Sequence, residues 1–166
     1  MLFRSAKDLR TQEALKEQFL RQEPERVYVA VVHGHPHPAD GTWTDVIAWD
    51  DKSLQQKRTL RHDPRAKEAV TRYRVLDTLA GAALVEFRLV TGKRNQIRIQ
   101  AQLHGHTLVG ERLYAPADLA DRVAFPRQAL HARTLAFRHP RDGRPLRFDA
   151  PLPDDLQGLV ARLRAR

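Results

Sequence analysis

A basic loop between an alternating segment and a helical one holds the residue types best suited to chemistry in this sequence. The loop TGKR at residues 91–94 interrupts the alternation of residues 84–90 and places Lys93 beside Arg94. Asn95 is then expected to cap a helix through its side-chain oxygen. Two cations beside the amide-rich start of a helix suit an anionic ligand, most simply a phosphate. An ordinary connection with solvated charges is the alternative on these residues alone.

A group of histidines in a proline-rich loop is the second candidate. His33, His35 and His37 alternate over the segment HGHPHPADG. The chain contains no cysteine, and the segment has no glutamate that could complete a ligand set. We therefore interpret the segment as a polar turn and predict no metal site. Nothing in the sequence requires an organic cofactor.

The helix that follows the basic loop should present two different faces. Ile97 and Ala101 are four residues apart, as are Ile99 and Leu103, and they mark an apolar side. Asn95, Arg98 and Gln102 fall on a shared polar face. Gly105 is expected to end the helix.

The remaining elements follow from periodicity and turn residues. Alternating or β-branched segments predict strands over residues 27–32, 42–48, 71–75, 84–90, 130–137 and 146–148. The first should be buried on both faces, and Gly81 should join the third and fourth as an antiparallel hairpin. Helices are predicted from about residue 8 to 22 and after Pro153. These elements indicate an α+β fold, a mixed and mainly antiparallel sheet with flanking helices, in a single domain over residues 1–166.

Charge indicates the partner. The 166 residues carry 29 lysines and arginines against 20 acidic residues, a formal charge of +9 that favours polyanions such as RNA. Arg72 and Arg74 would form the basic outer face of their strand. The basic segment 50–67 is expected to be disordered, to contact RNA, or to form a solvated hairpin. No apolar run is long enough for a membrane span and the first residues are no signal peptide, so we expect a cytoplasmic protein.

One long segment resembles a known family signature. The run TGKRNQIRIQAQLHGHTLVGERLYAP is similar to that of the RluA-type pseudouridine synthases (RluA/RsuA superfamily), T-G-R-x-H-Q-I-R followed by G-x-P-L-x-G-D-x-x-Y. Lys93, Asn95 and Glu111 stand where the signature has Arg, His and Asp. The segments RVYVAVVHG, EAVTRYRVL and QALHARTLAFRHPRDGRPLRFDAPLP also resemble the family. The matching signature positions are Thr91, Gly92, Gln96, Ile97, Arg98, Gly105, Leu108, Gly110 and Tyr114.

The resemblance implies an isomerase that converts uridine to pseudouridine in ribosomal or transfer RNA. By its pattern, Tyr28 lies against the base and Arg98 pairs with a catalytic aspartate, so both should line one pocket. RNA-binding positions are expected at Lys93, Arg94, Asn95, Gln96, Arg72 and Arg74.

The family's aspartate is missing, because no His-Arg-Leu-Asp run occurs in the sequence. We therefore expect a pseudouridine-synthase-like domain without its first strands, beginning at residues 1–3 just after the catalytic loop. Arg98 would then face an empty position, and the chain alone would be inactive. An open sheet edge would be left for a second polypeptide or a second copy. The alternatives are a non-catalytic RNA-binding remnant and a half-enzyme completed by another chain.

Overall fold

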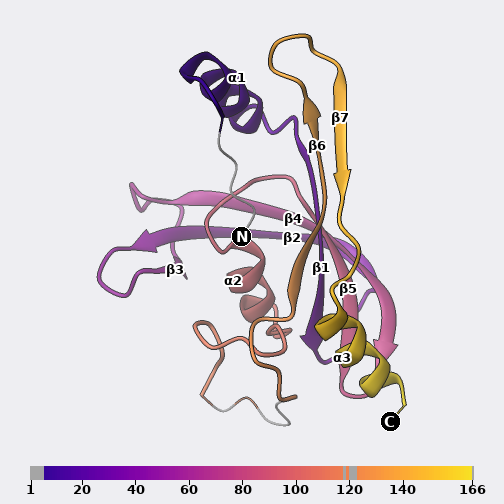
Figure 1. Cartoon of the computed structure of the whole chain (residues 1–166). Coiled ribbons are helices and arrows are strands. Elements are labelled where there is room, and N and C mark those ends of the chain that lie inside the picture. Colours follow the sequence, from indigo (N-terminus) through magenta and orange to yellow (C-terminus); the bar gives the residue numbers. More distant parts are fainter. Residues whose placement is uncertain (1–5, 118, 120–122, 166) are drawn as a thin grey trace.

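The chain folds around one seven-stranded sheet with the strand order β3-β2-β4-β5-β1-β6-β7 (Figure 1). The computed structural model describes residues 6–117, 119 and 123–165, so the expectation for residues 1–3 lies outside the described part. The strands are β1 (Glu25–His33), β2 (Asp40–Asp50), β3 (Gln55–Arg58), β4 (Lys67–Leu79), β5 (Ala82–Leu89), β6 (Leu130–Arg138) and β7 (Pro145–Asp149). The helices are α1 (Leu9–Leu20), α2 (Gln96–Leu103) and α3 (Asp154–Arg164).

The sheet is antiparallel between every pair of neighbouring strands. The predicted α+β class and mainly antiparallel sheet are therefore confirmed, whereas the mixed component was wrong. The hairpin of β4 and β5 is also as predicted, and Gly81 adopts a φ of 65° at its turn. The next strand in the chain, β6, does not pair with β5. Instead β1, which comes earlier in the sequence, lies between them and pairs with β5 on one side and β6 on the other.

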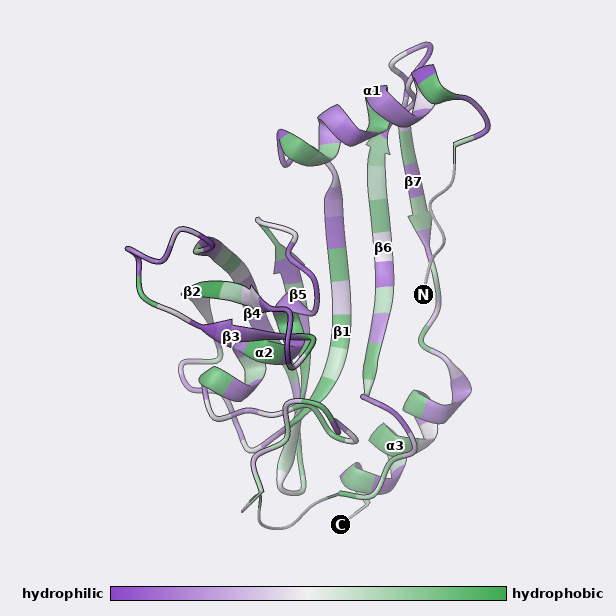
Figure 2. Ribbon diagram, turned by 90° about the vertical axis from the view of Figure 1, so that its left-hand side faces the viewer, coloured by the Kyte–Doolittle hydropathy of each residue, from purple (hydrophilic) through white to green (hydrophobic). Residues whose placement is uncertain are grey.

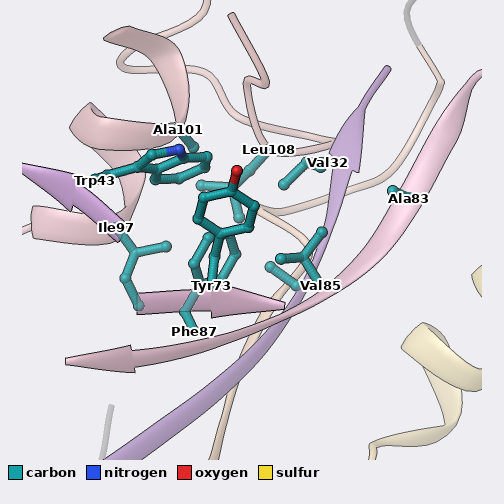
Figure 3. Packing of buried hydrophobic residues seen from close by; sticks show 10 residues of the cluster. Val32, Trp43, Tyr73, Ala83, Val85, Phe87, Ile97, Ala101 and Leu108 are labelled. Atoms are coloured by element: carbon teal, nitrogen blue, oxygen red, sulfur yellow. The ribbon is translucent and has the colours of Figure 1, made fainter. Parts of the chain in front are cut away.

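Strand β1 is buried on both faces, as its continuous apolar run predicted. On one face Ala30 and Val32 pack in a cluster with Trp43, Phe87 and residues of α2 (Figure 3). Val31 belongs to a separate cluster on the other face, where α3 packs. Because neighbouring residues of a strand point to opposite faces, one short segment anchors both layers.

One helix precedes the first strand and another follows the last strand. Helix α3 buries Leu156, Leu159, Val160 and Leu163, the apolar residues that predicted it. Helix α1 buries no residue and ends at Leu20, two positions before the predicted end. It lies across the end of the β6–β7 hairpin (Figure 2), where the Gln18 side chain hydrogen-bonds the backbone of Arg138.

The basic segment after β2 forms the hairpin that was one of its three predicted outcomes. Strand β3 pairs with β2, and the Asp50 carboxylate accepts backbone N–H bonds from Lys52 and Ser53 at 2.9 Å each in the turn. The expectation of disorder was therefore wrong for this segment. Strands β3 and β7 form the two edges of the sheet.

Within the described part of the chain, every helix is too short or too polar to cross a membrane.

Candidate functional site

Helix α2 is fixed to the sheet by two buried glutamines. The Gln96 amide nitrogen donates to the Val70 carbonyl (3.1 Å) and to Thr71 Oγ1 (2.9 Å), while its oxygen accepts from Thr91 Oγ1 and from the Lys93 backbone N–H. Gln100, fully buried, bonds Thr71 and the Asp45 carboxylate. Since buried polar groups are costly unless they are paired, this network holds the basic loop and the helix in one arrangement.

The start of α2 differs from the prediction. Asn95 has a left-handed backbone with a φ of 55°, and its side chain caps no backbone N–H, so its expected capping role was wrong. The Gln96 side-chain oxygen instead accepts from the Lys93 N–H, which belongs to the loop before the helix. The Asn95 side chain is left to donate to the Tyr114 hydroxyl at 3.4 Å.

Arg98 is paired, which contradicts the expected empty position. Its Nε donates to Glu111 Oε2 at 2.7 Å and its Nη2 to Oε1 at 2.6 Å, a two-point grip. The Glu111 side chain is fully buried and that of Arg98 is 17% exposed. The third nitrogen, Nη1, makes one long bond of 3.3 Å to Asn95 Oδ1.

Glu111 is held in its ionised form by its surroundings. Burial by itself would raise the pKa of this carboxyl, but the hydrogen bonds from Arg98 and from the backbone of Leu113 and Tyr114 outweigh it, so the pKa lies below its ordinary value. With its lone pairs used by these donors, Glu111 orients the Arg98 guanidinium and is not free to act as a nucleophile.

Tyr28 and Arg98 line the same cleft, which has a volume of about 670 Å³. They come from β1 and α2, which approach each other only through the tertiary fold. The remaining lining residues are Arg26, Leu89, Lys93, Asn95, Gln96, Ile97, Arg127, Gln128, Leu130, His131, Ala132, Thr134, Leu135 and Ala150.

The charged side chains that line the cleft are all positive. Its cations come from Arg26, Lys93, Arg98 and Arg127, and its lining includes no aspartate or glutamate from the described part of the chain. Cationic and apolar groups with a half-buried tyrosine suit a ligand that combines an anionic backbone with a flat ring. Among the described lining residues there is no carboxylate that could act as a nucleophile.

The other predicted positions separate into three groups. Lys93 and Asn95 line the cleft with Gln96, but the Gln96 side chain is 2% exposed and fully engaged by the protein. Arg94 lies outside the cleft, over the ring of Trp49. Arg72 and Arg74 are on the reverse face of the sheet, because Thr71 and Tyr73 between and beside them face α2.

Two cleft cations were missed from the sequence. Arg26 precedes Tyr28 by two positions, so strand alternation places both on one face, and this was the available signal. Its guanidinium explains Gly92, because a Cβ at that position would lie 2.0 Å from Arg26 Nη1. Arg127 had no local signal, since its position depends on a two-point ion pair with Asp155 at the start of α3.

The histidine loop takes part in the fold. His35 Nε2 lies 2.9 Å from the Leu79 carbonyl oxygen, and the His33 carbonyl lies 3.2 Å from His106 Nδ1. In the residues that the structure describes, no three potential metal ligands gather.

Comparison with known sequences gives a consistent family. A family model described as RNA pseudouridylate synthase matches residues 2–103. An uncharacterized RNA pseudouridine synthase of Bacillus subtilis is 40% identical over 159 residues, covering 96% of this chain and 50% of the relative. Ribosomal large subunit pseudouridine synthase D of Zymomonas mobilis is 38% identical over 154 residues, covering 90% and 48%. The chain thus spans about half the length of these relatives.

Solved structures share the fold. The human protein RNA Pseudouridylate Synthase Domain Containing 4 superposes with a TM-score of 0.76 at 23% identity, over 95% of this chain and 69% of that one. Human RNA Pseudouridylate Synthase Domain Containing 1 gives 0.73 at 21% identity, over 97% and 74%.

Proposed function

Because this chain belongs to the RNA pseudouridylate synthase family, we propose that its cleft binds a uridine of ribosomal or transfer RNA and takes part in converting it to pseudouridine, as in the RluA type. The observation that carries the proposal is the single cleft shared by Tyr28 and Arg98. Both residues were expected at this site from the family pattern. We expect the reaction to take place in the cytoplasm, where these RNAs are located.

The reaction sets clear demands on the cleft. The bond from the sugar to uracil N1 breaks, the base turns, and the sugar rejoins at C5. The uridine must leave its stack to be reached, so the cleft needs a surface for the base and cations for the flanking phosphates. Tyr28 supplies a flat ring, and Arg26 and Lys93 supply positive charge beside it. A volume of about 670 Å³ is in the range of small-molecule sites and suits one extruded nucleotide.

A carboxylate is also required, and we propose that a second polypeptide supplies it. The described residues that line the cleft include none, and Glu111 is saturated by Arg98 and three backbone N–H groups. The guanidinium of Arg98 is held by Glu111 through Nε and Nη2, so Nη1 is the edge that an incoming carboxylate would bind. Such a cation would keep the carboxylate ionised and oriented. We therefore expect this chain to be inactive alone.

Tritium release from RNA labelled at uridine C5 tests the proposal. The purified chain alone should release no tritium. A mixture of the chain with a polypeptide that carries a His-Arg-Leu-Asp run should release it. Arg98→Lys keeps the charge but loses the forked geometry, so it should slow release by about 100-fold or more. Arg58→Lys, on the exposed edge strand β3, is the matched control and should leave the rate unchanged.

Release by the chain alone would contradict the need for a second polypeptide. The second candidate function is RNA binding without catalysis, which the absence of a carboxylate from the described cleft lining favours. Salt-sensitive RNA binding with no release under either condition would support that alternative.

A further inference from the structure

Trp49 and Arg94 form a cation–π pair beside the cleft. Trp49 lies on β2 next to the hairpin turn and is half-buried, while Arg94 comes from the basic loop before α2 and is exposed. The guanidinium carbon of Arg94 is 4.3 Å from the centroid of the Trp49 ring. Among the described residues, no carboxylate forms an ion pair with Arg94.

The pair is connected to the cleft by a short series of contacts. Trp49 faces Gln56 across the β2–β3 ladder, and the Gln56 backbone N–H donates to the Tyr114 hydroxyl at 3.0 Å. The Tyr114 ring lies under the Arg98 guanidinium, with 5.3 Å from Cζ to the ring centroid. Asn95, which adjoins Arg94 in the chain, lines the cleft and donates to the same hydroxyl.

We propose that Trp49 and Arg94 form a stacking site for an unpaired RNA base that flanks the nucleotide in the cleft. The inference rests on the proposed RNA function and adds a second base position to it. An indole beside an unpaired guanidinium offers the two groups that grip unpaired nucleotides, a ring for the base and a planar cation for the base or its phosphate.

The magnitudes favour a ligand over a structural pair. An exposed cation–π contact contributes less than the stacking of one base on an aromatic ring. An incoming base can therefore displace Arg94 from Trp49 with a net gain, and the freed guanidinium can bind the adjacent phosphate. Asp50, which follows Trp49 in the chain, does not oppose this, because its carboxylate is paired with Lys57 Nζ at 2.5 Å.

Anisotropy of a dye-labelled single-stranded oligouridylate measures the affinity of the full chain. Trp49→Ala should weaken binding by about 5- to 150-fold, which corresponds to the loss of one stacked base. Trp49→Phe keeps a ring and should recover most of that loss. Leu60→Ala, which alters an exposed residue that follows the same hairpin, is the control and should bind as the wild type does.

The salt dependence separates the two partners. Stacking is not ionic, so Trp49→Ala should leave the slope of log affinity against log salt unchanged, whereas Arg94→Ala should reduce it by about 0.7.

Intrinsic fluorescence gives a second measurement, because the chain has two tryptophans and Trp43 is 5% exposed. RNA should quench the wild-type emission, and Trp49→Phe should abolish the quenching.

The outcomes distinguish this inference from the function on which it rests. Equal affinity of the wild type and Trp49→Ala for RNA would overturn the stacking site while leaving RNA binding in place. Failure of the wild type to bind the RNA at all would overturn both.

Discussion

The buried ion pair between Arg98 and Glu111 determines how the cleft presents its central cation. Glu111 stands where the RluA-type signature has aspartate, and its two oxygens both accept from the guanidinium. Three successive backbone N–H groups bind the same carboxylate. The pair therefore connects the α2 helix to the turn that follows it and fixes the direction of Nη1.

Replacing Glu111 with glutamine should destabilise the protein strongly. The change leaves Arg98 without a counter-charge in a site where the carboxylate is fully buried, and breaking such a pair costs about 3 kcal/mol or more. Urea unfolding of Glu111→Gln measures the loss. Glu17→Gln removes an exposed ion pair with Arg21 in α1 and should cost less than about 1 kcal/mol. Equal losses in the two variants would contradict the structural role of Glu111.

Two glycines with the same backbone angle allow a second test at this scale. Gly110 and Gly143 both have a φ of 72°. A Cβ at Gly110 would lie 2.0 Å from the Arg127 carbonyl oxygen, while at Gly143 it would meet nothing within 4 Å. Alanine at Gly143 should cost only the strain of a left-handed residue, about 1–2 kcal/mol. Alanine at Gly110 should cost about 1–3 kcal/mol more through overpacking, measured by thermal or urea unfolding. Similar losses would show that the turn can move away from the new Cβ.

At the scale of elements, three strands are held together on the reverse face of the sheet by one carboxylate. Glu86 of β5 is 3% exposed and pairs with Arg74 of β4, Arg88 of its own strand and Arg133 of β6. Burial would raise the pKa of Glu86, but the hydrogen bond from Arg88 and the charges of Arg88 and Arg133 outweigh it, so the pKa lies below the ordinary 4.5.

This pairing gives the stability a defined pH dependence. Because the folded-state pKa of Glu86 is depressed, its contribution is complete above the unfolded value near 4.5 and is lost as the pH falls through the folded value. The wild type should therefore lose more free energy of unfolding than Glu86→Gln between about pH 5 and pH 3. Urea unfolding across this range is the measurement. Parallel curves for the two proteins would rule out Glu86 as a source of the acid sensitivity.

On the scale of the whole molecule, the basic groups face two ways. The cleft with Lys93 opens on the α2 side of the sheet, and Arg72 and Arg74 lie on the reverse side. A short RNA cannot cover both faces, so the expected contacts at Arg72 and Arg74 require an RNA that passes around the sheet. The formal charge of +9 would assist such long-range association.

Salt titrations with two lengths of RNA test this arrangement. With a short oligonucleotide, Lys93→Ala should reduce the salt slope by about 0.7, and the double variant Arg72→Ala/Arg74→Ala should leave it unchanged. With a long folded RNA both variants should reduce the slope. If the double variant alters the slope for the short oligonucleotide, the reverse face itself holds the RNA.

The local sequence pattern by itself determined several of the strands and helices of this protein. The β-branched run of β1, the alternation of β4 and β5, and the apolar spacing of α3 each reflect which side chains are buried, and burial is encoded by residues two to four positions apart. The signature around residues 91–114 likewise indicated the family, and the family pattern predicted that Tyr28 and Arg98 line one pocket.

Only the tertiary structure decided which side chains pair with one another. The partner of Arg98 lies thirteen positions away beyond a turn, that of Arg94 lies on a different hairpin, and that of Arg127 is on α3. Asparagine tolerates a left-handed backbone better than most residues, but its type also suits a helix cap, and only the structure distinguishes the two at Asn95. Such contacts depend on the strand order, which places β1 between β5 and β6, and no periodicity within a segment specifies its distant neighbours.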